Sequence, residues 1–387
     1  MMPSMGPRSA DPVQALPVTS SDPEGAGGAG RREPSRRTTA GRVTIQQVAE
    51  AAGVSIATVS RSMRRSGTVR PDLAERVLRV ADELGYQPSA AAQGLATGVT
   101  GMVGVIVPSL ANPYFYDIIK AMNDAASIDG YRMLIADAGE DPGEEVALAR
   151  GFERQVDATV LVSPRMPESA LHSLGSRSHP VVLVNRAEVG VGLPSVAVDN
   201  RAAMFALAGH LATLGHRRVA YLAGPAASWQ QGERWRALEQ ASAFGIESSG
   251  IPAGASIADG YAATDAALEL RPTAIMCFDD LVAFGALSRL RDLGVDVPGE
   301  VSLTGFDDIE LARFAHPPLT TAVSPQREIG RHAWRLARRL LAGERPSPEP
   351  LLPVPIVVRA STAPPGRARG GTRAHQRGDG APQDRPA

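Results

Sequence analysis

The stretch VTIQQVAEAAGVSIATVSRSM, residues 43–63, contains two short helical patterns separated by a glycine turn. Thr44 can cap the first helix while Gln47 reaches back to it, and apolar residues follow at helical spacing until Gly53. Ser55 can cap the second helix. Two short helices joined in this way predict a helix-turn-helix.

A third helical pattern begins with Pro71 at the first helical position and stops at Gly85. It is expected to close a small core around the first two helices, toward which Val59 and Met63 of the second helix point. The second helix then leaves another set of side chains facing out. These are Ile56, Ala57, Ser60, Arg61 and Arg64.

From Gly101 onward, short apolar runs rich in β-formers alternate with helical stretches, first MVGVIVP, YRMLIAD, ATVLVSP and PVVLVN, then SVAVDN, RVAYLAG, AIMCFDD and VSLTGFDD. Such runs, bounded by turns and helices, predict parallel sheets with both faces covered. Two successive groups indicate two similar lobes, with ligand contacts at the carboxyl ends of the strands. The helix IGRHAWRLARRLLAG precedes a final strand, LLPVPIVVR, so the chain is expected to recross between the lobes.

The 387 residues are 43% hydrophobic and 21% charged, the composition of a globular chain of two or three domains. No apolar run approaches the roughly 18 residues of a transmembrane helix, and the N-terminus lacks the apolar core of a secretion signal. We therefore expect a cytoplasmic protein without a membrane partner. The single cysteine, Cys277, excludes internal disulfides and multi-cysteine zinc sites. Residues 1–40 and 361–387 predict disorder; their arginines either attract a polyanion nonspecifically or are only solvated.

These segments closely resemble the LacI/GalR family of transcription regulators. Residues 43–63 and the segment at 70–98, RPDLAERVLRVADELGYQPSAAAQGLATG, resemble that family's DNA-binding head. VGVIVPSLANPYFYDII, LATLGHRRVAYLAGP, PTAIMCFDDLVAFGAL and VSLTGFDDIELARFAHPPLTTA resemble its effector-binding core. The resemblance covers about residues 42–360. It implies a homodimer, possibly a dimer of dimers, that binds a pseudo-palindromic double-stranded operator and responds to a sugar or sugar derivative, as inducer or as corepressor.

The expected fold is an all-α helix-turn-helix head followed by an α/β core of two lobes with parallel sheets, as in periplasmic binding proteins. The expected boundaries are a disordered extension at 1–41, the head at 42–88, a hinge helix and linker at 89–100, the core at 101–360 and a disordered tail at 361–387. Within the core, lobe one takes about 101–198 and 324–352, and lobe two about 199–323 and 353–360.

In a helix-turn-helix, the start of the second helix meets base edges while flanking groups hold phosphates. Ile56 and Ala57 can offer apolar contact to a thymine methyl, and Arg61 can form a bidentate pair with guanine. By resemblance, the phosphate holders are Thr44, Ser55, Thr58 and Ser60. Arg64 stands where the family usually has asparagine, which leaves its target open between base and phosphate. Arg61 and Arg64 could instead only solvate a helix face.

Arg70 replaces the usual Ser or Thr cap of the third helix, which should weaken that cap. The segment SAAAQGLA, residues 89–96, is too short to be a stable helix alone. By resemblance it is a hinge helix that folds on DNA, with Leu95 wedged into the minor groove and Ala92 beside it. From its own sequence context, Leu95 could instead be an ordinary linker or core residue.

Candidate effector contacts follow the strands of the core. Asn112, Tyr114 and Phe115 lie in the loop NPYF, where aromatic rings and an amide suit an uncharged polyol, although the two rings could simply pack the lobe interface. The other positions come from the resemblance. They are Arg165, Arg234, Tyr261, Asp280 and Gln326. Arg234 and Asp280 could clasp adjacent hydroxyls or could form a structural ion pair.

No catalytic motif is present. The pairs Asp279–Asp280 and Asp307–Asp308 are adjacent in sequence, so on a strand their side chains would point to opposite faces and would not converge. The seven histidines lack ligand spacing. We therefore expect no enzyme activity, no cofactor and no metal. A DNA-binding regulator, most simply a repressor, bound to the bacterial nucleoid, is the favoured function; a sugar-binding protein without a DNA role is the alternative, and an α/β enzyme comes third.

Overall fold

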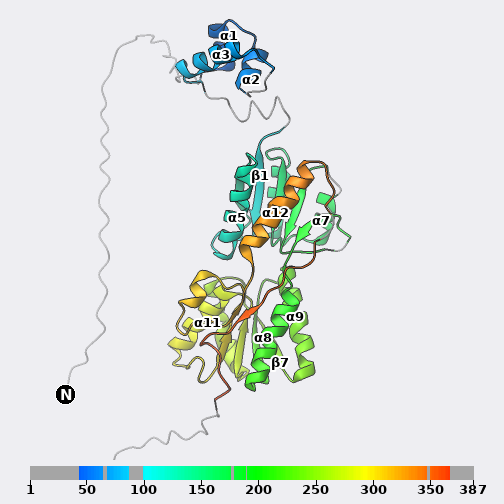
Figure 1. Ribbon diagram of the computed structural model, residues 1–387. Helices are drawn as coiled ribbons and strands as arrows, with labels where there is room; N and C mark the ends of the chain where they lie inside the picture. The colour runs from blue at the N-terminus through cyan, green and yellow to red at the C-terminus, as the bar shows by residue number, and fades with distance from the viewer. Residues whose placement is uncertain are drawn as a thin grey trace, which may run out of the picture. The chain divides into compact units, whose positions relative to one another are not determined.

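The computed structural model describes residues 43–63, 68–86, 99–175, 178–188, 190–346 and 349–366. The chain divides into two compact units, Met1–Pro88 and Ser89–Ala387. Figure 1 shows a helical head in blue and a larger α/β core coloured from cyan to red.

The head contains the three predicted helices, α1 (Ile45–Ala52), α2 (Ile56–Met63) and α3 (Pro71–Glu83). The predicted capping box is present, because Thr44 accepts from the Gln47 amide and the Gln47 side chain accepts from the Thr44 amide. Gly53 ends α1 with φ 62°, a left-handed conformation that favours glycine. The side chains that the three helices bury together form the core of the head: Val48, Ala49, Ala52, Val59, Val77 and Ala81.

Arg70 precedes α3 and provides no side-chain cap, as expected. Its guanidinium lies 3.1 Å from the Asp72 carboxylate, which is two residues further on. Both side chains are exposed, so this ion pair adds little to stability.

The first lobe of the core is built on a parallel sheet in the order β2-β1-β3-β4-β5. The strands are β1 (Met102–Val107), β2 (Arg132–Asp137), β3 (Ala158–Val162), β4 (Val181–Val184) and β5 (Ser195–Val196). The helices α5 (Tyr114–Ile128) and α12 (Gln326–Leu341) pack against each other on one face. The other face is covered by α6 (Pro142–Phe152) and α7 (Glu168–Gly175). Alternate strand residues enter the two cores, as a doubly covered sheet requires.

The second lobe repeats this plan with a parallel sheet in the order β7-β6-β8-β9. Its strands are β6 (Arg218–Ala223), β7 (Glu247–Pro252), β8 (Ala274–Cys277) and β9 (Ser302–Thr304). Its helices are α8 (Asn200–Leu214) and α9 (Trp229–Ala241) on one face, and α10 (Ile257–Glu269) and α11 (Asp280–Asp292) on the other. Short 3₁₀ turns occur at Ser242–Phe244 and Glu310–Arg313.

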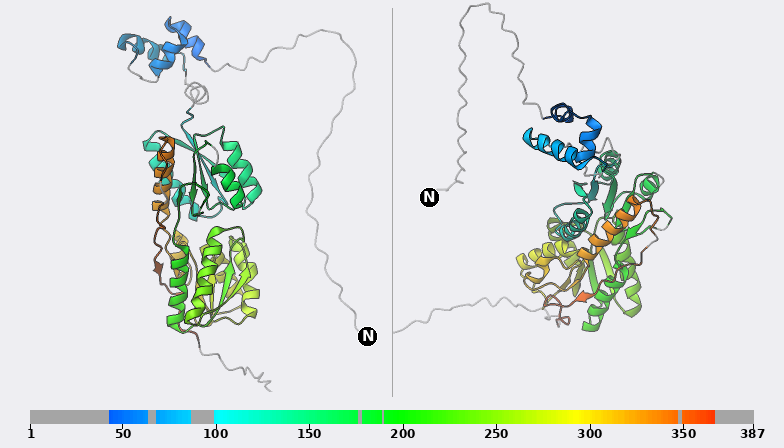
Figure 2. Two further views of the ribbon diagram at one scale, coloured as in Figure 1. Left: turned by 90° about the vertical axis from the view of Figure 1, so that its right-hand side faces the viewer. Right: turned by 45° about the horizontal axis from the view of Figure 1, so that its top comes forward.

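The chain passes between the lobes after β5, again before α12, and once more after α12 (Figure 2). At these crossings β10 (Thr321–Ala322) pairs antiparallel with β11 (Ile356–Val357), and Val198 forms a bridge with Leu352. The predicted final strand is therefore much shorter than LLPVPIVVR suggested. Pro353 and Pro355 explain the difference, because proline has no N–H to donate to a ladder.

Two close helix contacts depend on glycine. At Gly330 of α12, a Cβ would collide with the carbonyl oxygen of Ile118 in α5. At Gly285 of α11, a Cβ would collide with the carbonyl oxygen of Ile257 in α10. In the described part of the chain, no helix is long and apolar enough to cross a membrane.

Candidate functional site

One face of α2 in the head is open to solvent. Ile56 is 44% exposed, and Ala57 and Arg61 are also exposed. The Arg61 Nε donates to the Ala57 carbonyl at 3.2 Å, so its guanidinium lies along this face. The three predicted base readers therefore lie together on one exposed surface.

The predicted phosphate holders lie on α2 or just before α1 and α2. Ser55 Oγ accepts from the Thr58 amide at 3.2 Å and so caps the start of α2, and it lies 2.9 Å from Thr58 Oγ1. Thr44 caps α1, and Ser60 is half-buried. Ser62 was not identified from the sequence; it is buried and donates to the Thr58 carbonyl at 2.9 Å. Arg64, Ala92 and Leu95 lie outside the described residues.

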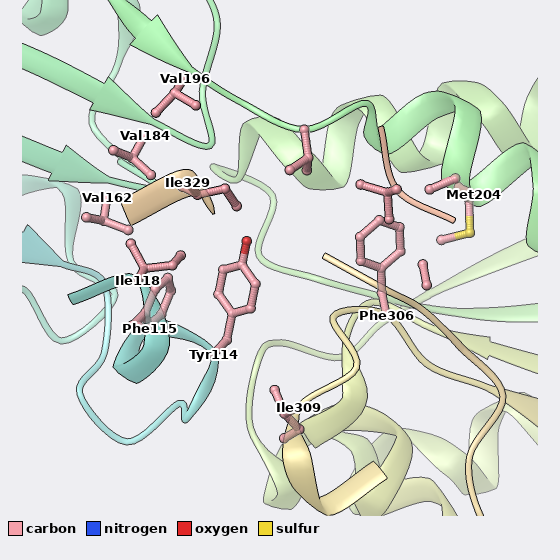
Figure 3. Packing of buried hydrophobic residues seen from close by; sticks show 14 of the residues in the cluster. Tyr114, Phe115, Ile118, Val162, Val184, Val196, Met204, Phe306, Ile309 and Ile329 are labelled. Carbon is pink, nitrogen blue, oxygen red and sulfur yellow. The ribbon is translucent and has the colours of Figure 1, made fainter. Parts of the chain in front are cut away.

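A narrow cleft lies between the two lobes of the core, with a cavity volume of about 20 Å³. The residues that line the cleft follow the carboxyl ends of strands from both sheets. Next to the cleft, Figure 3 shows Tyr114 and Phe115 of the first lobe and Phe306 and Ile309 of the second lobe within one cluster of buried hydrophobic residues. Five predicted residues line the cleft: Asn112, Tyr114, Phe115, Arg165 and Arg234. Seven more were not predicted: Glu140, Ser163, Gln230, Ala255, Phe278, Asp279 and Asp307.

The loop NPYF connects the lobes directly. Asn112 Nδ2 in the first lobe lies 3.3 Å from Asp279 Oδ2 in the second. The Tyr114 hydroxyl accepts from Asn185 Nδ2 at 2.9 Å and lies 3.1 Å from Ser324 Oγ, at a crossing segment. Burial raises the pKa of Tyr114 above its usual value, so this hydroxyl stays protonated.

Arg165 is held in place by two acids. Its guanidinium makes bonds of 2.8 and 3.3 Å to the Glu140 carboxylate and of 3.0 Å to the Ser163 carbonyl. Glu145 Oε2 accepts from the backbone amides of Arg165 and Met166 at 2.8 and 2.6 Å. Glu145 is fully buried, and its other oxygen has no hydrogen-bond partner in the described structure. Burial raises the pKa of Glu145 to about 7, against the opposing effect of those two amides.

Arg234 lies on the opposite wall and is 4% exposed. Its Nε donates to Asn200 Oδ1 at 3.0 Å, and its Nη1 donates to the Phe278 carbonyl. Its Nη2 lies 3.7 Å from Asp307 Oδ1, and the guanidinium stacks 3.5 Å from the centre of the Phe306 ring. This arrangement fits a cation–π contact in a desolvated site.

Three sequence-predicted contacts do not line the cleft. Tyr261 is 37% exposed on α10 and donates to Asp292 Oδ2 at 2.8 Å, because that face of α10 packs toward α11. Asp280 is buried, and it accepts from Thr321 Oγ1 at 2.7 Å and from the Ile309 amide at 2.9 Å. It therefore holds α11 against the crossing segment, and it is Asp307, not Asp280, that pairs with Arg234.

Gln326 is the third of these residues. Its Nε2 donates to the Asp307 carbonyl at 2.7 Å from the start of α12. It supports the backbone of a cleft residue without lining the cleft itself.

Each acidic pair in the sequence does diverge, but one member of each reaches the cleft. Asp279 caps α11 through the Val282 amide at 2.9 Å and lines the cleft, while Asp280 points elsewhere. Asp307 lines the cleft, while Asp308 pairs with Arg359 at 2.6 Å. Asp279 from one pair and Asp307 from the other therefore meet in the cleft, which comparing only sequence neighbours could not predict. Among the described residues, no group of three or more His, Cys, Asp or Glu side chains could hold a metal ion.

Comparison with known proteins agrees with this geometry. The family described as bacterial regulatory proteins, lacI family, matches residues 44–89, and a periplasmic binding protein-like domain matches residues 208–362. The HTH-type transcriptional regulator DegA of Bacillus subtilis is 30% identical over 337 residues, which cover 84% of this chain and 99% of DegA.

Two solved structures share the fold. A Lac repressor dimer bound to operator and the anti-inducer ONPF superposes with a TM-score of 0.75 at 25% identity, over 84% of this chain and all of that one. A complex of the transcriptional regulator CelR with cellobiose gives 0.62 at 30% identity, over 83% of this chain and all of that one. With its helix-turn-helix head and its two-lobed core, the chain belongs to the LacI family of bacterial regulatory proteins, which are DNA-binding transcriptional regulators and not enzymes.

Proposed function

We propose that this protein is a repressor that binds a pseudo-palindromic operator as a homodimer, and that a sugar or sugar derivative in the interlobe cleft controls its affinity for that operator. The cleft carries the proposal, because both lobes supply its walls and Asn112 contacts Asp279 across it. The operator-bound dimer of Lac repressor supports the proposed binding to DNA as a dimer. The cellobiose complex of CelR supports the proposed binding of a sugar.

In the head, Ile56, Ala57 and Arg61 are proposed to read bases in the major groove. Ile56 and Ala57 suit a thymine methyl, and Arg61 suits the O6 and N7 acceptors of guanine. Four hydroxyl residues are proposed to hold phosphates and fix the register of the head on the duplex. They are Thr44, Ser55, Thr58 and Ser60.

Three further DNA contacts are proposed outside the described residues. Arg64 is proposed to reach either a base or a phosphate at the end of the recognition helix. Leu95 is proposed to insert as an apolar wedge in the minor groove, with Ala92 beside it, at the cost of unstacking one base step. The interval 89–100 would then serve as a hinge and linker between the head at 42–88 and the core at 101–360.

The proposed coupling requires two arrangements of the lobes. A ligand can change operator affinity only by binding one arrangement more tightly than the other. Replacing the 3.3 Å contact between Asn112 and Asp279 with ligand contacts on both lobes would provide such a difference. The proposed effector contacts are Asn112, Tyr114, Phe115, Arg165 and Arg234. Tyr261, Asp280 and Gln326 are not proposed as direct contacts.

Footprinting on the DNA that flanks the protein's own gene tests the proposal, followed by a thermal-shift screen of sugars and nucleosides. We expect two protected half-sites about one helical turn, or a multiple of it, apart, and binding that weakens steeply with salt. A metabolite that shifts the melting temperature should also change the footprint. Equal affinity for all genomic fragments, with and without metabolites, would refute the proposal. Acting on such sites would place the protein in the cytoplasm, at the nucleoid.

A further inference from the structure

The two guanidinium groups of the cleft are already occupied by the protein. Arg165 donates to the Glu140 carboxylate through two nitrogens and to the Ser163 carbonyl through the third. Arg234 donates to Asn200 and to the Phe278 carbonyl, and its remaining nitrogen faces Asp307. The Nε and Nη2 atoms of Arg165 are taken by Glu140 and the Nε of Arg234 is taken by Asn200, so neither residue has its side-on pair of parallel donors free for a phosphate or a carboxylate.

Two carboxylates of the cleft, those of Asp279 and Asp307, accept fewer hydrogen bonds than they could. Asp307 is 5% exposed, and within the described structure no hydrogen bond reaches its carboxylate; its nearest cationic atom is 3.7 Å away on Arg234. Asp279 is 2% exposed and accepts one backbone bond at 2.9 Å and one long amide bond at 3.3 Å. A carboxylate can accept about four hydrogen bonds, so both residues present open lone pairs.

The charges of the cleft do not balance. The charged side chains lining it are the carboxylates of Glu140, Asp279 and Asp307 and the guanidinium groups of Arg165 and Arg234. Burial, aided by the charge of Glu140 and opposed by the Val282 amide, Arg234 and Arg165, raises the pKa of Asp279 to about 7. Burial and the charge of Asp279 raise the pKa of Asp307 well above its usual value. Without a further positive charge the raised pKa values favour protonated aspartates, and a cationic ligand would shift both toward their ionised forms.

The aromatic rings of the cleft are also compatible with a cationic ligand. Tyr114, Phe115 and Phe278 line it, and the faces of such rings attract cations. Arg234 already uses this attraction, lying 4.8 Å from the centre of the Phe278 ring.

We propose that the effector carries a protonated amine that pairs with Asp279 and Asp307, so that the cleft selects amino sugars and other polyhydroxylated amines over neutral sugars and rejects sugar phosphates. This inference rests on the proposed role of the cleft as the effector site. Hydroxyl groups of such a ligand can donate to the remaining carboxylate lone pairs. The ammonium supplies the positive charge that the two aspartates lack.

Matched ligand pairs test the proposal by isothermal titration of the full-length protein at pH 7. The pairs are glucosamine with glucose, galactosamine with galactose, mannosamine with mannose and glucamine with sorbitol, and glucose 6-phosphate is the anionic probe. In at least one pair we expect the amine to bind about tenfold or more tightly than its neutral partner, the effect of one well-placed buried charge pair. We expect no measurable binding of the phosphate.

Three conservative variants locate the preference. In Asp279→Asn the side-chain oxygen still caps α11, and in Asp307→Asn asparagine suits the left-handed backbone, where φ is 110°. Each should reduce the preference for the amine to about threefold or less, because the amide removes the charge and keeps the shape. The control is Asp308→Asn, whose carboxylate faces Arg359 outside the cleft; it should keep the preference of the unmodified protein.

Binding of the neutral sugar as tight as that of its amine in every pair, binding of glucose 6-phosphate, or no binding by any amine would overturn this inference. The inference would also be overturned if both Asp279→Asn and Asp307→Asn kept the preference of the unmodified protein. If a neutral or phosphorylated sugar binds and also changes the footprint on DNA, the proposed regulatory function stands and only the amine selectivity fails. A footprint unaffected by every metabolite would instead remove the proposed function itself.

Discussion

Replacing Glu145 by glutamine should make the stability of the core less sensitive to pH. Glu145 is fully buried on α6 and accepts two backbone bonds that hold the Arg165 loop. A glutamine side-chain oxygen can accept the same two bonds. The substitution therefore removes a titrating group from the interior while it keeps the hydrogen bonds that position the loop.

The magnitude follows from the pKa of Glu145, which is about 7 in the folded chain against an ordinary value of 4.5. Because the folded-state pKa is raised, the unfolded chain releases this proton first, and the stability falls as pH rises from about 4.5 to about 7. Between pH 5 and pH 8 this loss amounts to about 2.5 kcal/mol. The glutamine variant should not suffer it, so relative to the unmodified protein it gains roughly 5 °C in melting temperature over that interval.

Thermal unfolding of both proteins at pH 5 and at pH 8, followed by circular dichroism, measures this difference. Glu144→Gln is the matched control, because Glu144 is exposed and precedes Glu145 on the same helix. The control should follow the unmodified protein at both pH values. Parallel shifts of the melting temperature in the Glu145→Gln variant and the unmodified protein would refute the assignment of a raised pKa to this carboxyl.

Gly330→Ala should destabilise the core by about 1–3 kcal/mol in urea unfolding, because its Cβ would collide with the Ile118 carbonyl. Gly209→Ala, inside α8 with no atom within 4 Å of the added Cβ, should instead stabilise it by about 0.5–1 kcal/mol; equal effects of the two would contradict the packing argument. Arg61→Ala should lower the preference for operator over scrambled DNA by about 1–3 kcal/mol in gel-shift titrations, and an unchanged preference would exclude it as a base reader. Leu95→Ala should weaken operator binding and leave effector affinity intact; unchanged operator affinity would count against the wedge.

The helices of the head could be predicted closely because their ends are encoded locally. The capping box at Thr44 and the left-handed Gly53 are both visible in the sequence and both present in the structure. The apolar strands of the core were equally visible. The strand β7 and the helix α10 were not identified. The residues of β7, ESSGIP, form a largely exposed edge strand without an apolar run, and such a strand depends on pairing with β6 rather than on its own composition.

The cleft could be predicted only in part. Residues that follow a strand were the right place to search, and Asn112, Tyr114 and Phe115 were found in this way. Asp279 and Asp307 were dismissed because each was compared only with its own neighbour. They follow β8 and β9, and these strands are adjacent in the sheet, although their order in space cannot be read from the sequence. Tyr261 was proposed from the resemblance, and it lies off the cleft because the orientation of α10 depends on its packing against α11.

The position of α12 determines the order in which the two lobes can finish folding during translation. This helix belongs to the first lobe, where it packs on α5 and against β3, β4 and β5, yet it is translated after the whole second lobe. Until residue 341 has emerged, the sheet face that α12 covers has no permanent cover. The lobe that is translated first is therefore completed last, and a chain truncated before α12 leaves apolar surface available to chaperones and proteases.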